Sequence, residues 1–356
     1  MESILPMPRL IKLDELLKVG FYDFYNSKNC IFKGCRKNSK FDGLMPIEFQ
    51  NDRTLVGLFY HDCMELGYKA NSIEELKAEI EELIAQYQIK VSSNSNLRKM
   101  GSFSNWRDVN FASRRVCEVY RTRKNSEDTV EIRSEDFLKS ACGSFVGRLD
   151  QYKITSNIAK LLELKSSEIR DINGEIKNEY REQILFYSFL LFQNFEIQSV
   201  KATLESMSGD VFECEISKNE SQAYYEKCVK ELTDMNSKIK NLKITDELEQ
   251  ITNSTKDNCT YCNKRIVCNS FKQKQMNLNL EGASYVLHGN IIKIDTQALN
   301  ADTIEFFDIN LDKIIKIRCD KSIAQHIDEN SKRVFFGASF NAGIFIINSR
   351  TQIFYE

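Results

Sequence analysis

The sequence contains few proline and glycine residues and no long apolar run. Only 3 Pro and 14 Gly occur among 356 residues, which excludes collagen-like segments and argues against long disordered linkers. Residues 1–10 show no apolar core next to a cleavage site, so no signal peptide is expected. The longest strongly apolar stretch, residues 183–192, is far shorter than the roughly 20 residues that cross a bilayer. We therefore expect a cytoplasmic protein that does not bind membranes.

Neither sign of charge dominates the chain. The 49 Lys and Arg residues are balanced by 51 Asp and Glu residues, for a net charge of −2, so nucleic acid could be bound only through a local basic patch. A hydrophobic content of 42% with 28% charged residues is typical of a globular protein with a sizeable core. A length of 356 residues favours two domains.

Hydrophobic periodicity predicts an α/β domain over residues 1–274 and a small β-barrel domain over residues 275–356. Helices are expected over residues 1–25, 55–66, 72–87, 178–194 and 221–241. Strands are expected over residues 129–132, 144–152, 157–165, 197–205 and 211–216. In the second domain, strand-like runs cover residues 284–295, 303–309, 313–318, 333–336, 343–347 and 352–355, with one short helix over 322–328. An OB-like barrel is the expected fold, and an SH3-like barrel is nearly as compatible.

Four short motifs follow one another in the first domain. They are Gly57-x-x-x-His61 on a helix, Gly147-x-x-Asp150 at the end of a strand, Glu163-x-Lys165 on the next strand and Gln183-x-x-x-Tyr187 on the following helix. Strand alternation puts Glu163 and Lys165 on one face of their strand. Gln183 and Tyr187 point off one helical face, where the amide could bond DNA or the site itself and the phenol could stack or bind phosphate. Each motif alone is weak, so the argument depends on their combination and order.

These residue types suit metal-assisted hydrolysis of a phosphodiester. Carboxylates from Asp150 and Glu163 favour Mg²⁺ or Mn²⁺, and an imidazole from His61 favours Mn²⁺. Such a metal polarises the phosphodiester and lowers the pKa of its bound water. The ammonium of Lys165 would orient that water and neutralise charge that develops at phosphorus.

In this order the four motifs resemble those of the RecB-like branch of the PD-(D/E)xK nucleases, over roughly residues 25–270. The resemblance implies a nuclease core made of a mixed sheet flanked by helices. It also implies that His61, Asp150, Glu163 and the backbone carbonyl of Leu164 bind the metal, and that Lys165 is the catalytic lysine. The proline usually named in the superfamily motif is absent before the aspartate, which is common in this branch.

Three of the eleven cysteines form a C-x2-C-x5-C motif, Cys259, Cys262 and Cys268. In a reducing compartment such spacing indicates metal or cluster ligands, and spacing alone does not separate zinc from iron–sulfur. RecB-like relatives with a [4Fe–4S] cluster pair this triplet with one distant cysteine before the nuclease motifs. The resemblance therefore implies Cys35 or Cys30 as the fourth ligand, with a slight preference for Cys35 from its context. The ligand set would close a loop of over two hundred residues around the core.

A basic segment lies between Arg98 and Lys124, where eight basic residues accompany two acids. Aromatic residues interleave with the bases, a combination that suits binding of a single nucleic-acid strand. The candidate contacts are Arg98, Lys99, Trp106, Arg107, Arg114 and Arg115. Alternatively, some arginines pair with nearby acids and Trp106 belongs to the core.

The main hypothesis is a Mg²⁺- or Mn²⁺-dependent deoxyribonuclease that acts on single-stranded DNA or DNA ends, with exonuclease action favoured. The alternative is a nucleic-acid-binding subunit of a repair, defence or CRISPR-adaptation complex in which cleavage is secondary. No Walker-type G-x-x-x-x-G-K-[ST] loop occurs in the sequence, so any helicase motor is expected on another chain.

Overall fold

The computed structural model describes residues 5–35, 37–46, 52–93, 101–124, 132–242, 248–260, 262–280, 285–296, 301–325, 327–347 and 351–355. The chain divides into two units. We call residues Leu17–Phe21 and Phe49–Lys230 the sheet unit, and residues Met1–Leu16, Tyr22–Glu48 and Glu231–Glu356 the barrel unit. The expected domain boundary after residue 274 falls inside the barrel unit.

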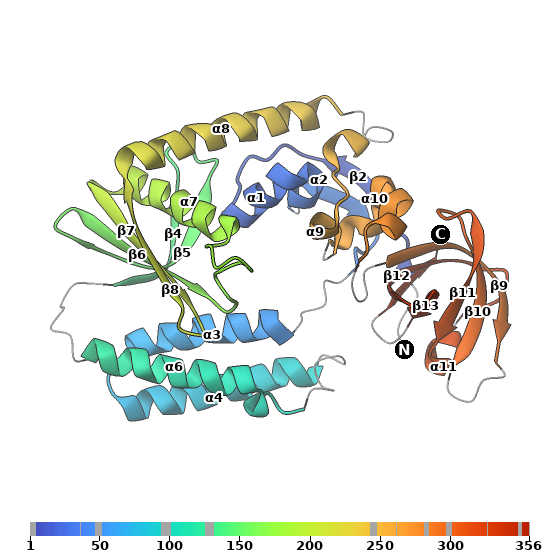
Figure 1. The fold of residues 1–356 in the computed structure, drawn as a ribbon, viewed down its shortest axis with the longest axis horizontal. Coiled ribbons are helices and arrows are strands. Elements are labelled where there is room, and N and C mark those ends of the chain that lie inside the picture. The colour runs from blue at the N-terminus through green and yellow to red at the C-terminus, as the bar shows by residue number, and fades with distance from the viewer. Residues whose placement is uncertain are drawn as a thin grey trace. The chain divides into compact units, whose positions relative to one another are not determined.

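The sheet unit contains a five-stranded mixed sheet in the order β4-β5-β6-β7-β8 (Figure 1). The strands are β4 Arg133–Lys139, β5 Val146–Thr155, β6 Ile158–Lys165, β7 Ser199–Ser206 and β8 Val211–Ser217. Neighbours are antiparallel except β6 and β7, which run parallel. A parallel pair needs a crossover, and helix α7, Asn178–Asn194, supplies it with the expected bounds.

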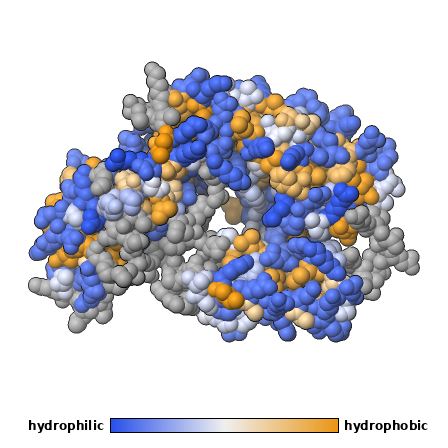
Figure 2. All heavy atoms as spheres, turned by 180° about the vertical axis from the view of Figure 1, so that it is seen from behind, coloured by the Kyte–Doolittle hydropathy of each residue, from blue (hydrophilic) through white to orange (hydrophobic). Residues whose placement is uncertain are grey.

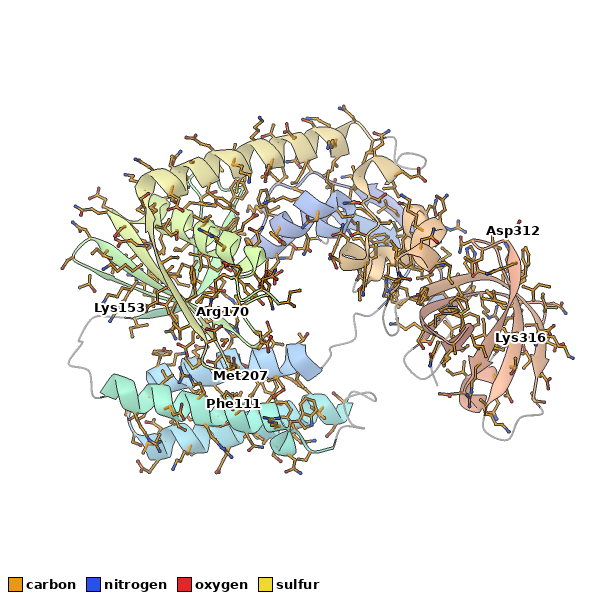
Figure 3. All side chains as sticks on the ribbon, viewed as in Figure 1. Phe111, Lys153, Arg170, Met207, Asp312 and Lys316 are labelled. Carbon is orange, nitrogen blue, oxygen red and sulfur yellow. The ribbon has the colours of Figure 1, made fainter. Side chains whose placement is uncertain are left out.

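Helices cover both faces of this sheet (Figure 1). Helix α7 lies on one face, and α3 Asp52–Lys69, α4 Ile73–Ser93 and α6 Arg107–Lys124 form a layer on the other. The core of that layer includes Phe59, Phe103 and Trp106, and it extends to Leu164 of β6 and to Met207, which Figure 3 labels. The Phe103 ring lies 5.2 Å from that of Phe59, measured between centroids. The expected mixed sheet flanked by helices is therefore confirmed.

The barrel unit contains a closed barrel of five strands, joined in the order β9-β10-β11-β13-β12 and back to β9. The strands are β9 Tyr285–Asp295, β10 Asp302–Asp308, β11 Lys313–Cys319, β12 Lys332–Asn341 and β13 Ile344–Ile347. Strands β11 and β13 are parallel, and helix α11, Lys321–Ala324, lies between β11 and β12 in the chain. The expected OB-like barrel is confirmed. Strands β14 Gln352–Tyr355 and β1 Leu5–Pro6 extend its sheet beyond β12.

The N-terminal helix expected over residues 1–25 is wrong. Strand β2, Arg9–Leu13, pairs with β3, Ser39–Asp42, and only α1, Phe21–Asn29, is helical there. Pro6 and Pro8 have no N–H to donate inside a helix. The pairing partner lies about thirty residues away, and such long-range pairing overrides local periodicity.

Short helical segments precede the barrel within the barrel unit. They are α2 Ile31–Gly34, η2 Leu248–Ile251, α9 Lys256–Cys259, η3 Asn263–Val267, α10 Asn269–Lys274 and η4 Gln275–Asn277. The buried amide of Gln275 donates to the carbonyl of Val286 over 2.8 Å and accepts from its N–H over 2.9 Å. This pair of bonds holds the segment against β9.

Two further elements complete the description. The short helix η1, Phe103–Asn105, precedes α6, and α8 runs over Lys218–Lys240, as expected from the sequence. Within the described part of the chain, no helix has both the length and the apolar content needed to span a membrane.

Candidate active site

The end of β6 carries a buried acid and a buried base in contact. The Lys165 ammonium donates to Glu163 Oε1 over 2.7 Å, and the side-chain amide of Gln183 on α7 donates to the same oxygen over 2.8 Å. Only 2% of Glu163 and 7% of Lys165 is exposed. The other carboxylate oxygen, Oε2, has no hydrogen-bond partner among the described residues. One oxygen of Glu163 is thus fixed by the protein, and the other is buried without a partner among the described residues.

The electrostatics of Glu163 agree with this geometry. Burial raises the pKa of this carboxyl, the charge of Asp150 raises it further, and Lys165 opposes the rise. A buried carboxylate is costly unless cations or donors surround it. A cation at Oε2 would remove that cost.

The other two motifs converge on the same place. Asp150 Oδ2 accepts a hydrogen bond from the Leu164 N–H over 2.7 Å, which ties β5 to β6 at the E-x-K motif. Asp150 Oδ1 lies 3.5 Å from Nδ1 of His61 on α3. The structure therefore brings together His61, Asp150, Glu163 and Lys165, as the motifs predict.

The motif glycines allow close approach of the helices. A Cβ on Gly57 would lie 2.9 Å from Ser166 Oγ and 3.3 Å from Ser166 Cβ, directly after β6, so either Ser166 or the helix would have to shift. A Cβ on Gly147 would lie 2.7 Å from Leu190 Cδ1 and 2.9 Å from Tyr187 Cε1 of α7. Both glycines thus allow close packing of α3 and α7, which carry His61 and Gln183.

Gln183 and Tyr187 contact the protein. The Gln183 amide also lies 3.2 Å from the Tyr187 hydroxyl, and only 7% of Tyr187 is exposed. The sequence left open whether the Gln183 amide bonds DNA or the site itself. In the structure it donates to Glu163 of the site. Tyr187 packs under Gly147 and helps to fix Gln183.

The structure adds Glu135, which the sequence analysis missed. Single ligand atoms of His61, Glu135 and Asp150 all lie within 4.8 Å of one another, a spacing that could hold a metal ion. Glu135 lies on β4, an edge strand that carries no motif and begins directly after the strand expected over residues 129–132, of which 129–131 lie outside the described residues. A possible signal was its acidic sequence, Arg133-Ser-Glu-Asp136, directly before the motif strands.

A family model described as the PD-(D/E)XK nuclease superfamily matches residues 38–269. The chain belongs to this nuclease superfamily. No curated protein matches it. Among solved structures it is similar to a putative exonuclease from Eubacterium rectale, with 9% identity, a TM-score of 0.38, and coverage of 68% of this chain and 90% of that one. It is also similar to an alkaline exonuclease from Laribacter hongkongensis, with 14% identity, a TM-score of 0.25, and coverage of 55% and 91%.

The nuclease also gathers four cysteines within its barrel unit. Cys30 is the N-cap residue of α2, and its charge affects the pKa values of Cys259, Cys262 and Cys268, so its thiol lies near all three. Burial raises the pKa of Cys259 to about 11 and that of Cys268 to about 12. Cys35 is fully buried, and of these cysteines only Cys30 affects its pKa.

Two buried cations flank the cysteines. The Lys264 ammonium, on a residue 3% exposed, donates to the carbonyls of Phe32 and Cys35 over 2.6 and 2.8 Å. Arg265 donates to the Cys262 carbonyl over 2.7 Å, and burial lowers its pKa to about 10 while Cys262 and Cys259 oppose the change. Buried positive charge beside four thiols suits an anionic thiolate-bound group.

The basic segment is mostly helix α6. Arg98 and Lys99 lie outside the described residues. Trp106 is only 9% exposed and belongs to the core, so it is not available to stack on a base. Arg115 bonds Glu205 on β7 over 2.8 Å, which fastens α6 to the sheet.

The remaining candidates on α6 lie on its solvent side. Arg107, Phe111, Arg114 and Arg121 are exposed at spacings that put them on one helical face. Phe111, labelled in Figure 3, is 44% exposed. Figure 2 shows hydrophilic and hydrophobic residues interspersed on the visible face, so a lone exposed phenylalanine is not unusual by itself. Its position among three arginines makes this face the candidate strand-binding surface.

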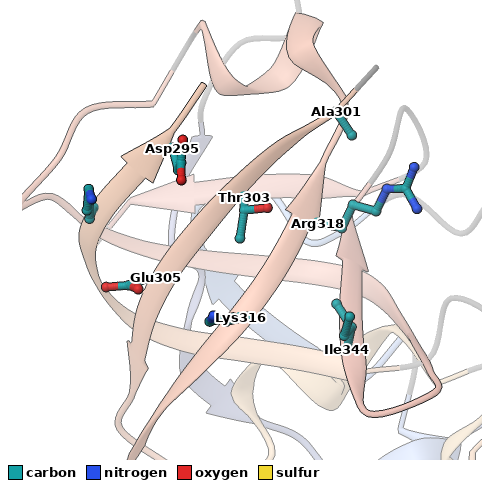
Figure 4. Close-up of a pocket in the computed structure, with 8 residues that line it drawn as sticks. Asp295, Ala301, Thr303, Glu305, Lys316, Arg318 and Ile344 are labelled. Carbon is teal, nitrogen blue, oxygen red and sulfur yellow. The ribbon is translucent and has the colours of Figure 1, made fainter. Parts of the chain in front are cut away.

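The OB-like barrel carries a separate groove, shown in Figure 4. Its volume is about 390 Å³, and it is lined by Lys293, Asp295, Ala301, Thr303, Glu305, Lys316, Arg318 and Ile344. Glu305 lies directly opposite Lys293 on one side and Lys316 on the other. The cross-strand acids and bases stabilise one another there, and the positive excess is small.

Proposed function

We propose that this nuclease is a Mg²⁺- or Mn²⁺-dependent deoxyribonuclease that acts on single-stranded DNA or DNA ends in the cytoplasm. The observation that carries the proposal is Glu163. Its Oε2 is buried without a partner among the described residues, next to Asp150, while Oε1 contacts Lys165. A divalent cation would satisfy Oε2, and the neighbouring ammonium is placed to act on a water beside it.

In this proposal His61, Asp150, Glu163 and the Leu164 carbonyl hold the cation. When bound, the cation would polarise the phosphodiester and lower the pKa of its water. The chain's own residues prepare the rest. Gln183 and Lys165 fix Glu163 Oε1, the Leu164 N–H fixes Asp150 Oδ2, and the Lys165 ammonium neutralises charge that develops at phosphorus.

The test is an assay on end-labelled linear and on circular single-stranded DNA with Mn²⁺, Mg²⁺ or EDTA. Cleavage of linear DNA alone, lost in EDTA, supports the favoured exonuclease action. Cleavage of circles identifies an endonuclease. Tight DNA binding without any cleavage would instead support the alternative, a nucleic-acid-binding subunit that works with a helicase or another partner chain.

The cysteines are proposed to hold a [4Fe–4S] cluster. The flanking Lys264 and Arg265 suit the negative charge of such a thiolate-bound cluster. The ligands are proposed to be Cys259, Cys262, Cys268 and Cys30, which is preferred here to Cys35 because its thiol lies near the other three.

A further inference from the structure

Glu135 of β4 lies close to Asp150 of β5. The pairs on either side of it join Ser134 with Gln151 and Asp136 with Leu149, whereas Glu135 itself, with a φ of 54°, forms no ladder pair with Asp150. One carboxylate oxygen of each acid lies within 4.8 Å of the other and of a His61 ring nitrogen. Like charges this close repel each other, so this pair needs positive charge nearby.

Arg148 supplies such charge from outside. Its Nε lies 2.8 Å from Glu135 Oε2, and the Arg148 side chain is 68% exposed whereas that of Glu135 is 25% exposed. An exposed ion pair contributes little to stability and can be exchanged for another partner at small cost. Glu135 is therefore neutralised by a group that can leave.

A second observation indicates what replaces it. Glu163 is 2% exposed, its Oε2 has no partner among the described residues, and its pKa responds to both Asp150 and Glu135. Asp150 and Glu135 thus lie beside His61 and close enough to Glu163 for their charges to affect it, and the buried Oε2 of Glu163 lacks a partner among the described residues. Carboxylate oxygens with at most one imidazole are the ligands that Mn²⁺ and Mg²⁺ prefer.

We infer that Glu135 is a further ligand of the divalent cation bound by His61 and Asp150. Arg148 forms an ion pair with Glu135 until the cation binds. This inference rests on the proposed function, because it concerns the same metal site. It assigns a role to a residue that no sequence motif marks.

The test measures binding of Mn²⁺ alone to the full-length protein by calorimetry, without DNA. Glu135→Gln keeps the size of the side chain and removes the charge. We expect its Kd for Mn²⁺ to rise at least about tenfold, since even outer partners of metal ligands affect affinity on that scale. The matched control is Glu213→Gln, on an exposed glutamate of β8 in the same sheet, and it should bind Mn²⁺ like the wild type.

Arg148→Gln tests the second half of the inference. It should tighten Mn²⁺ binding several-fold, and it should have no effect when Glu135→Gln is already present, because the two residues then act through one contact. If Glu135→Gln does not fold, the gain in affinity of Arg148→Gln still tests the inference, and an unchanged Kd contradicts it.

The outcomes separate the two proposals. A wild-type protein that binds no Mn²⁺ overturns the metal-dependent function itself. A wild-type protein that binds Mn²⁺ with the same Kd as Glu135→Gln overturns only the role of Glu135.

Discussion

Lys165 and Glu163 lie two residues apart on β6 and share a hydrogen bond of 2.7 Å. The bond uses only one oxygen of the acid, and Gln183 binds the same oxygen, so the second oxygen stays free of the described side chains. The lysine thereby orients the acid before any ligand binds. A single strand thus presents a buried carboxylate and an ammonium side by side, an arrangement that suits the metal-assisted hydrolysis proposed above.

The first prediction concerns the pH dependence of metal stabilisation. The pKa of Glu163 is raised above its ordinary value of 4.5 by burial and by Asp150. Without metal, the folded protein holds a proton that the unfolded chain releases, so this group stabilises the fold at low pH and the contribution is lost as pH rises above that value. Bound cation requires the ionised form. Mn²⁺ at about 100 times its Kd adds about 2.7 kcal/mol to the free energy of unfolding.

We therefore expect the rise in Tm caused by a fixed Mn²⁺ concentration to be larger at about pH 8 than at about pH 6. Thermal unfolding with Mn²⁺ or EDTA measures it. In EDTA, Glu163→Gln should flatten the fall of Tm with pH. An equal Mn²⁺ shift at both pH values would contradict the assignment of Glu163 as a ligand.

The second prediction separates Cys30 from Cys35. Protein purified without oxygen should be brown and contain iron and sulfide. Cys30→Ala and Cys259→Ala should bleach it and lower its Tm, because each removes a cluster ligand. Cys35→Ala is the matched control, because it makes the same substitution at the other end of α2. This variant should stay brown.

Two experimental results would contradict parts of the cluster assignment. Colourless protein with stoichiometric zinc, purified anaerobically from cells that build clusters, would overturn iron–sulfur while leaving a four-cysteine staple. Bleaching by Cys35→Ala but not by Cys30→Ala would reverse the choice of the fourth ligand.

The third prediction concerns α6. Arg114→Glu should weaken binding of single-stranded DNA and reduce the salt dependence of affinity by about one unit of slope or more, because an exposed phosphate contact is lost. Fluorescence anisotropy over a range of salt concentrations measures both. Lys77→Glu, on the exposed face of α4, makes the same charge change and should have a smaller effect.

Arg115 is expected to behave differently from Arg114. Reversing its charge would place a glutamate beside Glu205 and Glu118, with which Arg115 now pairs. Arg115→Glu should therefore lower Tm. If Arg114→Glu binds DNA with unchanged affinity and slope, α6 has only a structural role.

The parts of the site that could be predicted from the sequence depend on local patterns. Alternation along β6 and the four-residue spacing on α7 place Glu163, Lys165 and Gln183 without knowledge of distant contacts. Helix α6 could also be predicted from the sequence, because Val109, Ala112, Val116 and Tyr120 form an apolar stripe at helical spacing that is buried in the structure. The arginines between them were interpreted only as a basic segment.

Other features depend on pairing across the chain. Glu135 acquires a place in the site only through the register of β4 against β5. Strand β2 forms because β3 lies beside it, against the helical periodicity of its own residues. In the sequence, Trp106 is an aromatic residue among basic residues. Its burial follows from the packing of three helices. No local pattern contains that information.

The last prediction concerns Lys165, because it separates catalysis from binding. Lys165→Met keeps the length and packing of the side chain and deletes the ammonium, which acts on charge that appears only in the transition state. We expect the variant to bind DNA about as well as the wild type and to cut it about 10²–10³-fold more slowly, roughly 2.7–4 kcal/mol in the barrier. Single-turnover kinetics with Mn²⁺ and an independent measurement of DNA affinity give the two quantities.

The structure adds a stability component to that experiment. Lys165→Met leaves the buried Glu163 with one hydrogen-bond partner fewer, and loss of one partner of a buried polar group is destabilising. The Tm should therefore fall in EDTA and recover with Mn²⁺, which supplies the missing positive charge to the same carboxylate. The control is Lys160→Met on the same strand, where the side chain is exposed and both cleavage and Tm should stay unchanged. Near-normal cleavage by a folded, Mn²⁺-loaded Lys165→Met protein would exclude the E-x-K motif from catalysis, because no other ammonium is described in contact with Glu163.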